Sequence, residues 1–189
     1  MYRAGLDEVG RGCIAGPVIA AAVILPTRED WMAELTDSKK LTPAKRAKLA
    51  DIIRTRALDW AVGRAEVDEI DRINILEASM LAMTRACMGL SLKPDHALVD
   101  GNRYPPLGIP GSAIIGGDAL IPEISAASIL AKVVRDDEMV LMDRLFPGYG
   151  FSIHKGYPTQ LHQELLKQLG VTPVHRSSFK PVKKLLASE

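Results

Sequence analysis

The chain has 189 residues, 47% of them hydrophobic and 25% charged, with a formal net charge of +1; this length and apolar content suit a single domain over residues 1–189 with a sizeable core. The near-zero net charge excludes binding of nucleic acid through bulk positive charge, so a polyanion would have to be held by a local basic patch. The sequence contains neither an apolar run long enough to span a bilayer nor a recognisable secretory signal, so we expect no membrane partner.

The first elements form an expected hairpin followed by a helix. A strand is predicted at residues 2–8, and the continuous apolar run at residues 17–25 predicts a second strand that is covered on both faces. The loop at residues 10–16 joins them, so an antiparallel pair is expected. Thr42 and Pro43 are typical of an N-cap and a first-turn proline, and they predict a helix to about residue 55.

The later elements alternate and then become helical. Further strands are predicted at residues 60–66, 96–100 and 113–115, and further helices at residues 67–72, 74–89, 122–145, 158–169 and 178–187. This order predicts an α/β fold with a mixed five-stranded sheet flanked by helices. Helical crossovers are expected between the third, fourth and fifth strands. The helices after about residue 150 would form a C-terminal segment that binds substrate, although the last helix, around Lys183, Lys184 and Leu185, could instead only pack against the domain.

Four acidic residues stand at the ends of predicted elements. Asp7 and Glu8 close the first strand, Asp100 follows the fourth and Asp118 the fifth. Ligand sites in open α/β sheets lie at the carboxyl ends of strands, so these side chains are expected to meet at one edge. Such a cluster repels itself unless cations neutralise it, and its oxygen ligands suit Mg²⁺ or Mn²⁺. Asp100 and Asp118 taken singly could each be a turn or cap residue, but together with the opening motif they favour a metal site.

Regular strand geometry raises a conflict at the first pair of acids. Side chains alternate between the two faces of a strand, so Asp7 and Glu8 should not both point into one site. Either the strand ends or bulges there, or Glu8 reaches the metal from the side. We expect Asp7 to be the central ligand and Glu8 the peripheral one.

Cysteine and histidine do not add ligands to this predicted site. Cys13 and Cys87 lack metal-site spacing, and we expect both to be reduced, in the cytoplasm. His96, His162 and His175 also lack ligand spacing and are interpreted as structural or surface residues.

Candidate substrate contacts accompany the acids. Gly10, Arg11 and Gly12 would let backbone N–H groups and a guanidinium approach a phosphate or sugar closely. Tyr157 lies in a basic loop and could stack on a sugar or base, with a core tyrosine as the competing interpretation. Six cations lie between residues 154 and 184 against one acid, which indicates either a basic patch or a solvated tail: Lys155, Lys167, Arg176, Lys180, Lys183 and Lys184.

The predicted helix at residues 122–145 carries a polar stripe. Ser125, Ser128, Lys132 and Asp136 are spaced three, four and four residues apart, which places them along one helical face. Hydroxyls and an ammonium on one stripe suit a phosphate backbone, and an ordinary exposed polar face is the alternative.

The order of these segments resembles the bacterial ribonuclease HII family, the type 2 ribonucleases H. The matching motifs extend over nearly the whole chain: residues 7–12 (DEVGRG), 37–41 (DSKKL), 72–76 (RINIL), 99–102 (VDGN), 117–118 (GD), 124–133 (ISAASILAKV), 154–159 (HKGYPT) and 175–179 (HRSSF). Each motif alone would be a weak signal, but their number and order argue against chance.

The resemblance implies a ribonuclease H-like fold and an endonuclease that hydrolyses the RNA strand of RNA–DNA hybrids. It also implies incision 5′ to single ribonucleotides in duplex DNA, leaving 3′-hydroxyl and 5′-phosphate ends. By resemblance, Asp7, Glu8, Asp100 and Asp118 are the catalytic carboxylates, which bind two divalent ions, Mn²⁺ or Mg²⁺, with Asp7 bridging them.

The same resemblance assigns substrate contacts. The loop from Gly10 through Arg11 to Gly12 would read the ribose 2′-hydroxyl, the group that separates RNA from DNA at a given position. Tyr157 would sense the junction, and Lys39 would contact a substrate phosphate, alongside the stripe that includes Ser125 and Lys132. The implied partner is nucleic acid, and we expect a monomer.

One position departs from the family pattern. Members often carry lysine before the Gly-Asp pair, where this chain has Gly116, so a cation beside the metal site is missing. This difference bears on substrate affinity or metal preference rather than on the class of activity. The chain begins at its first strand, without the extra N-terminal domain of ribonuclease HIII, which favours HII.

Two alternatives to this function stay open. One is a ribonuclease H-like nuclease that acts on DNA ends or junctions without reading a 2′-hydroxyl. The other is a nucleic-acid-binding module whose acids are structural. Cutting that requires a ribonucleotide would distinguish a ribonuclease HII from the first alternative. Metal-dependent turnover would distinguish it from the second.

Overall fold

A mixed five-stranded sheet forms the centre of the protein and confirms the predicted fold class. The structure, a computed structural model, describes residues 1–188. The strand order is β3-β2-β1-β4-β5, with strands β1 (Arg3–Val9), β2 (Val18–Ile24), β3 (Asp59–Ala65), β4 (His96–Asp100) and β5 (Gly111–Ile114). β2 pairs antiparallel with β1 and β3, whereas β4 pairs parallel with β1 and β5. β1 and β4 therefore end at the same edge of the sheet.

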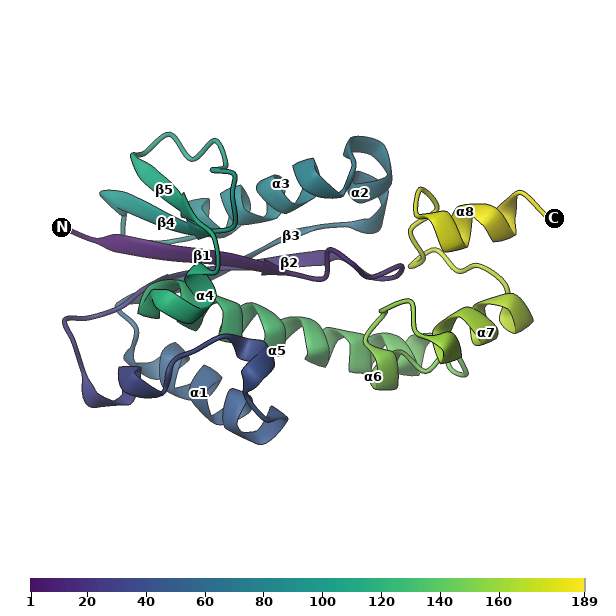
Figure 1. The fold of residues 1–189 in the computed structure, drawn as a ribbon, viewed down its shortest axis with the longest axis horizontal. Coiled ribbons are helices and arrows are strands. Elements are labelled where there is room, and N and C mark those ends of the chain that lie inside the picture. The colour runs from purple at the N-terminus through teal and green to yellow at the C-terminus, as the bar shows by residue number, and fades with distance from the viewer. Residues whose placement is uncertain (189) are drawn as a thin grey trace.

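Helices cover both faces of this sheet (Figure 1). One face carries α2 (Val67–Ile73) and α3 (Ile75–Met88), and the other carries α1 (Pro43–Arg56) and α5 (Pro122–Leu145). The C-terminal segment lies at the end of the molecule away from the N-terminus and consists of α6 (Phe151–His154), α7 (Gln160–Leu169) and α8 (Lys180–Leu186). Among residues 1–188, no helix has both the length and the apolar character needed to cross a bilayer.

Two glycines allow these helices to approach the strands closely. A Cβ atom on Gly5 of β1 would overlap the backbone of Glu123 in α5, and one on Gly63 of β3 would overlap the backbone of Ala82 in α3. Backbone therefore meets backbone at both contacts. The small side chains Ala20, Ala22 and others on β2 are fully buried between the two layers, so the sheet is covered on both sides as its apolar run predicts.

The connection between β4 and β5 differs from the prediction. A helical crossover was expected, but residues 101–110 form no helix. Gly101 and the three prolines at residues 105, 106 and 110 explain the difference, because proline removes a helical N–H donor and restricts the residue before it. Four short helices were also not predicted: η1 (Asp30–Glu34), η2 (Ser38–Lys40), α4 (Gly117–Leu120) and α6.

The C-terminal segment is attached to both α2 and the loop after β1. Asp71 of α2 accepts hydrogen bonds from the N–H and hydroxyl groups of Ser177 and Ser178, at 2.5–2.9 Å. The Gly16 N–H donates to the Val174 carbonyl at 2.8 Å. These contacts place residues far apart in the sequence against the carboxyl end of β1.

Three of the four histidines are buried within this segment. His154, His162 and His175 are 6%, 0% and 3% exposed. The structural interpretation of His162 and His175 therefore holds, and the surface alternative is excluded. Burial is the main cause that lowers the pKa of each of these two rings to about 4, against about 6.5 for an exposed histidine.

We expect the free energy of unfolding to decrease as the pH falls from about 6.5 towards about 4 because of these rings. The unfolded chain takes up their protons below about pH 6.5, whereas the folded protein does not until about pH 4, so the contribution is fully present only above about pH 6.5. For one ring the loss amounts to roughly 3 kcal/mol when complete.

Urea unfolding at about pH 7.5, 6 and 5 measures this loss. The acidic cluster described below contributes with the opposite sign, so the difference between the protein and a His162→Asn variant isolates one histidine. Parallel pH profiles for the two proteins would contradict the expectation.

Candidate active site

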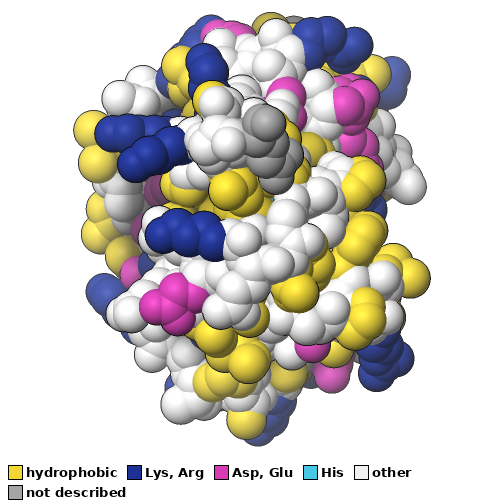
Figure 2. All heavy atoms as spheres, turned by 90° about the vertical axis from the view of Figure 1, so that its right-hand side faces the viewer, with side chains coloured by type: hydrophobic (Ala, Val, Ile, Leu, Met, Phe, Trp, Pro, Cys, Tyr) yellow, Lys and Arg dark blue, Asp and Glu magenta, His cyan; other side chains and the backbone are white. Residues whose placement is uncertain are grey.

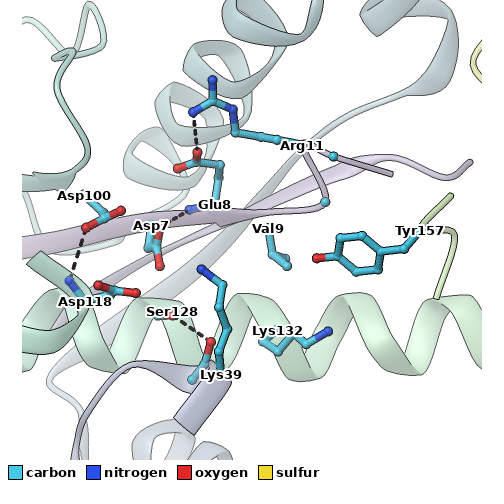
Figure 3. A pocket seen from close by; sticks show the side chains of 13 residues that line it. Asp7, Glu8, Val9, Arg11, Lys39, Asp100, Asp118, Ser128, Lys132 and Tyr157 are labelled. Carbon is cyan, nitrogen blue, oxygen red and sulfur yellow. Dashed lines mark hydrogen bonds and ion pairs between the residues drawn. The ribbon is translucent and has the colours of Figure 1, made fainter. Parts of the chain in front are cut away.

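A cleft of about 390 Å³ opens where β1 and β4 end, beside α5. All four predicted carboxylates line it, with contributions from the loop after β1, from η2, from α5 and from the turn after α6 (Figure 3): Asp7, Glu8, Asp100, Asp118, Gly10, Arg11, Gly12, Lys39, Ser128, Lys132 and Tyr157. The fold thus brings together acids that are widely separated along the chain.

β1 remains regular through its two acids. Asp7 pairs with Ala21 and Glu8 with Ala20 in unbroken antiparallel register. Asp7 is 6% exposed and points towards α5, whereas Glu8 leaves the other side of the strand, where its Oε1 lies 3.3 Å from Arg11 Nη1 (Figure 3). The bulge alternative is therefore excluded, and Glu8 approaches the cleft from the side.

Asp100 and Asp118 complete the acidic wall. Parallel pairing sets Leu6 beside Val99, so the residues that follow, Asp7 and Asp100, lie at neighbouring strand ends. Asp118 comes from the first turn of α4, and its backbone N–H donates to Asp100 Oδ1 at 3.2 Å. The short helix thus orients Asp118 towards β4, which the prediction of a simple strand end did not include.

The backbone conformation at residue 116 explains why glycine replaces the lysine that is frequent in the family. This residue precedes α4 with φ 68°, in the left-handed region that glycine adopts at little cost. No atom lies within 4 Å of a Cβ added there, so backbone conformation rather than space favours glycine. A lysine at this position would strain the backbone by roughly 1–2 kcal/mol.

Burial and mutual repulsion oppose ionisation of the acidic cluster. Burial is the largest cause that raises the pKa of Asp7 well above its usual range, and the charges of Glu8 and Asp100 add to it. Burial also raises the pKa of Glu8, against the effect of Arg11, and the pKa of Asp118. A divalent cation would relieve this repulsion, and an all-oxygen donor set is the one that Mg²⁺ and Mn²⁺ prefer. The residues present therefore fit a divalent metal by donor type and by charge.

The four carboxylates are not closed around one point as they stand. Within residues 1–188, no three His, Cys, Asp or Glu side chains form a ready-made metal-binding group. Three of the four have a local partner instead: Asp7 Oδ1 accepts from the Glu8 N–H at 2.8 Å, Glu8 faces Arg11, and Asp100 accepts from the Asp118 N–H. Metal binding would therefore require these side chains to rotate towards one another.

Two lysines reach the cleft, and one of them has a close carboxylate partner. Lys132 Nζ lies 2.7 Å from Asp136 Oδ1, and Arg46 Nη1 lies 3.6 Å from the other oxygen of the same carboxylate. Asp136 is thus paired with cations rather than with the acidic cluster. Lys39 extends from η2 towards β1, where Figure 3 shows its ammonium beside the acids.

The serines of α5 divide into one cleft residue and one interior residue. Ser128 lines the cleft, and its Oγ donates to Ser38 Oγ at 2.9 Å. Ser125 is 2% exposed, and its hydroxyl donates to the carbonyls of Asp118 and Ile121 at 2.6 and 3.1 Å. The structure therefore does not place Ser125 in the cleft, contrary to its prediction as a substrate contact. Its hydroxyl instead joins α4 to α5.

Arg176, which the sequence placed in a basic patch, is a buried support of the loop after β1. It is 0% exposed, and its guanidinium donates to the carbonyls of Gly10, Arg11 and Gly16 at 2.7, 3.1 and 2.9 Å. Burial lowers the pKa of Arg176 to about 10, so it stays charged at neutral pH. Lys167, Lys180, Lys183 and Lys184 are exposed. On the face that Figure 2 shows, the lysines and arginines are dispersed among other side chains rather than gathered in one patch.

Arg135 of α5 is a second buried arginine that sequence reasoning missed. It is also 0% exposed, and it donates to the carbonyls of Ala15, Pro17 and Lys155 at 3.1, 3.2 and 2.8 Å. It thereby ties the loop after β1 to the turn that carries Tyr157. The only hint of these buried arginines in the sequence was that Arg176 belongs to the His-Arg-Ser-Ser-Phe motif.

Tyr157 faces the acidic wall across the cleft. Its side chain is half-buried and lines the cavity, with the hydroxyl directed towards Val9 in Figure 3. Lys132 Nζ lies 5.9 Å from the ring centroid. The interpretation of Tyr157 as a core residue is therefore excluded.

Comparisons with known proteins agree with this geometry. The family model described as ribonuclease HII matches residues 4–182. The chain is 59% identical over 183 residues to "Ribonuclease HII" of Methylococcus capsulatus (strain ATCC 33009 / NCIMB 11132 / Bath), with 97% of this chain and 94% of the relative aligned.

Solved structures show the same architecture. The crystal structure of ribonuclease H2 from Pyrococcus horikoshii OT3 superposes with a TM-score of 0.82 at 28% identity, over 100% of this chain and 98% of that one. Bst-RNase HIII in complex with Mn²⁺ shares the fold, with a TM-score of 0.81 at 19% identity, over 100% of this chain and 70% of that one.

Proposed function

The chain belongs to the ribonuclease HII family, whose members are metal-dependent ribonucleases H, and we propose that it cuts 5′ to single ribonucleotides embedded in duplex DNA as well as within the RNA strand of hybrids. One observation carries this proposal: a single cleft has carboxylates on one wall and both the Gly10–Gly12 loop and Tyr157 around its rim. Hydrolysis and recognition of a ribose would thus occur at one place.

The chain's own residues divide the work. The Gly10–Gly12 loop, supported from behind by Arg176, would place backbone groups and Arg11 against the 2′-hydroxyl of the ribonucleotide. Tyr157 would stack on the neighbouring sugar or base. Lys39 and Lys132 would face the phosphates. Because the charge of Lys132 is paired with Asp136, we expect Lys39 to attract the phosphates more strongly.

We assign Asp7, Glu8, Asp100 and Asp118 as the residues that hold two divalent ions, Mn²⁺ or Mg²⁺. Asp7 is assigned as the central ligand because it is more buried than Glu8, its neighbour on β1. When bound, such ions acidify the attacking water and stabilise charge on the leaving 3′-oxygen. The Mn²⁺ named for Bst-RNase HIII, which shares the fold, supports this choice.

The test uses a labelled DNA duplex that contains one ribonucleotide, an all-DNA duplex of the same sequence, and a long RNA–DNA hybrid. We expect a nick 5′ to the ribonucleotide with Mg²⁺ or Mn²⁺, none with EDTA and none in the all-DNA duplex. Cutting of the hybrid without nicking of the single ribonucleotide would refute the proposed recognition while leaving the ribonuclease H activity. Cutting of the all-DNA duplex would indicate a nuclease that does not read the 2′-hydroxyl.

Replacing Tyr157 with alanine is expected to lower kcat/KM for the single-ribonucleotide duplex by roughly tenfold or more, since aromatic stacking on a base is worth about 1–3 kcal/mol. Cutting inside a long hybrid should fall less. The Tyr157→Phe variant keeps the ring and is the matched control. Equal losses on both substrates would show that Tyr157 does not discriminate between them.

A further inference from the structure

The turn that presents Tyr157 has an unfavourable backbone and needs support. Lys155 and Gly156 both have left-handed conformations, with φ of 53° and 84°. A residue other than glycine pays a steric cost there, so surrounding contacts must hold the turn. Arg135 binds the Lys155 carbonyl, and the Ile14 N–H donates to the Gly156 carbonyl at 2.9 Å.

Two buried imidazole rings bind backbone groups at Tyr157 and at the residue before it. The Gly156 N–H donates to His154 Nδ1 at 3.1 Å, and His162 Nδ1 lies 2.9 Å from the Tyr157 carbonyl oxygen. The two rings stack on each other, with centroids 3.9 Å apart and an interplanar angle of 9°.

The contacts continue to a third ring. His162 Nε2 lies 3.1 Å from His175 Nε2, and His175 Nδ1 lies 3.1 Å from the Thr172 N–H nitrogen and 2.8 Å from the Thr172 hydroxyl oxygen. We call His154, His162 and His175 the histidine relay. All three rings are buried, and Phe151 meets two of them edge-on at 5.5–5.7 Å.

The partners determine where each proton lies. A carbonyl only accepts, so His162 carries its proton on Nδ1, and its Nε2 must then accept from His175 Nε2–H. His175 Nδ1 is left as an acceptor, which agrees with the Thr172 N–H that can only donate. The Tyr157 carbonyl at one end and the Thr172 N–H at the other thus require the same donor-to-acceptor direction along these hydrogen bonds.

His154 obeys the same rule. Its Nε2 lies 2.7 Å from the Tyr149 carbonyl oxygen and carries the proton, so Nδ1 accepts from the Gly156 N–H. One neutral tautomer per ring therefore satisfies every contact. Among the charged groups of α5, Asp143 accepts from the Ser152 hydroxyl and acts electrostatically on His154, and Arg135 binds the Lys155 carbonyl.

We propose that the histidine relay is a set of positioning residues for Tyr157: its fixed hydrogen-bond direction holds the turn in the conformation that aims the tyrosine ring into the cleft. The inference rests on the proposed role of Tyr157 at single ribonucleotides. Apolar side chains of similar size could fill the same space. They would leave the Gly156 N–H without its acceptor and the Tyr157 carbonyl without its donor. The relay thus acts on substrate discrimination through the backbone of Gly156 and Tyr157.

The first test reads the tautomers directly in the unmodified protein, independently of activity. Two-bond ¹H–¹⁵N correlation spectra resolve ring protonation, and with four histidines in the chain His96 on β4 serves as an internal reference. We expect Nε2–H for His154 and His175 and Nδ1–H for His162 at neutral pH. Any other set of tautomers for these three rings would overturn the relay.

The second test compares His162→Leu with His162→Asn. Asparagine can place an amide N–H where Nδ1–H was, so it should keep the contact to the Tyr157 carbonyl that leucine removes. For the leucine variant we expect kcat/KM on the single-ribonucleotide duplex to fall about tenfold, as for one lost hydrogen bond, with a smaller loss on the long hybrid. The asparagine variant should recover most of the difference.

A double-mutant cycle separates positioning from general destabilisation. In a Tyr157→Ala background, His162→Leu should cause no further loss of discrimination between the two substrates. Independent, multiplicative losses would overturn the inference. If the unmodified protein does not nick the single-ribonucleotide duplex, the proposed function fails, which is distinct from a protein that nicks it equally well with and without His162.

Discussion

The Asp7→Asn variant is expected to lose cleavage of both hybrid and single-ribonucleotide substrates by at least about 10³-fold, because metal-supplied charge stabilisation is worth several kcal/mol. Its fold should be retained. Asparagine keeps an oxygen for the Glu8 N–H that Asp7 Oδ1 now accepts at 2.8 Å. It also removes a buried charge next to Glu8 and Asp100, so the free energy of unfolding without metal should be unchanged or higher.

Three measurements define that result: the rate with Mn²⁺ or Mg²⁺, metal binding by calorimetry, and urea unfolding in EDTA. Asp137, exposed on α5 and outside the cleft, supplies the matched control, since Asp137→Asn also removes one negative charge. Wild-type turnover in Asp7→Asn would refute the assignment of the central ligand. A large loss of stability would instead show that Asp7 is needed for folding.

The largest expected effect on stability comes from Arg176→Leu. The guanidinium binds three carbonyls of the loop after β1 and lies 5.0 Å from the Phe179 ring centroid. Leucine fills part of the volume but leaves those carbonyls without their donors, at about 1–3 kcal/mol for each buried unsatisfied group. We expect a loss of roughly 3–5 kcal/mol in the free energy of unfolding, together with loss of activity because Gly10 and Arg11 lose their support.

Arg176→Lys keeps the charge but cannot reach three acceptors at once, so its stability should lie between those of the protein and of the leucine variant. Arg28→Leu, at an exposed arginine, is the control and should change stability by less than about 0.5 kcal/mol. Urea unfolding of the three variants gives the ranking. If Arg176→Leu and Arg28→Leu had equal stability, the buried contacts would have no energetic role.

The strands and the acidic wall could be predicted because their causes are local. The apolar run of β2 and the position of Asp7 and Asp100 at strand ends follow from alternation and from the geometry of α/β sheets. The β4–β5 connection was predicted wrongly because a helical crossover is the usual link between parallel strands, and the prolines of residues 101–110 were not weighed against it.

The supports of the site could not be predicted in the same way. An arginine in a basic stretch is usually exposed, and nothing near Arg176 in the sequence shows that its acceptors are carbonyls of residues 10–16. Ser125 shows the converse error: helical spacing placed it on the right stripe of α5, but the short helix α4, which the sequence did not reveal, covers its hydroxyl. The metal-ligand and substrate-contact assignments remain predictions that the variants above examine.

During synthesis, the loop after β1 is made long before Arg176, the residue that supports it. The Gly16 carbonyl and the guanidinium that binds it are separated by 160 residues. At synthesis rates of about 5–20 residues per second, that loop is made roughly 10–30 s before its buried donor. A nascent chain therefore contains Asp7, Glu8 and Arg11 long before it contains the arginine that supports their loop, so we expect nuclease activity only after Arg176 has been made.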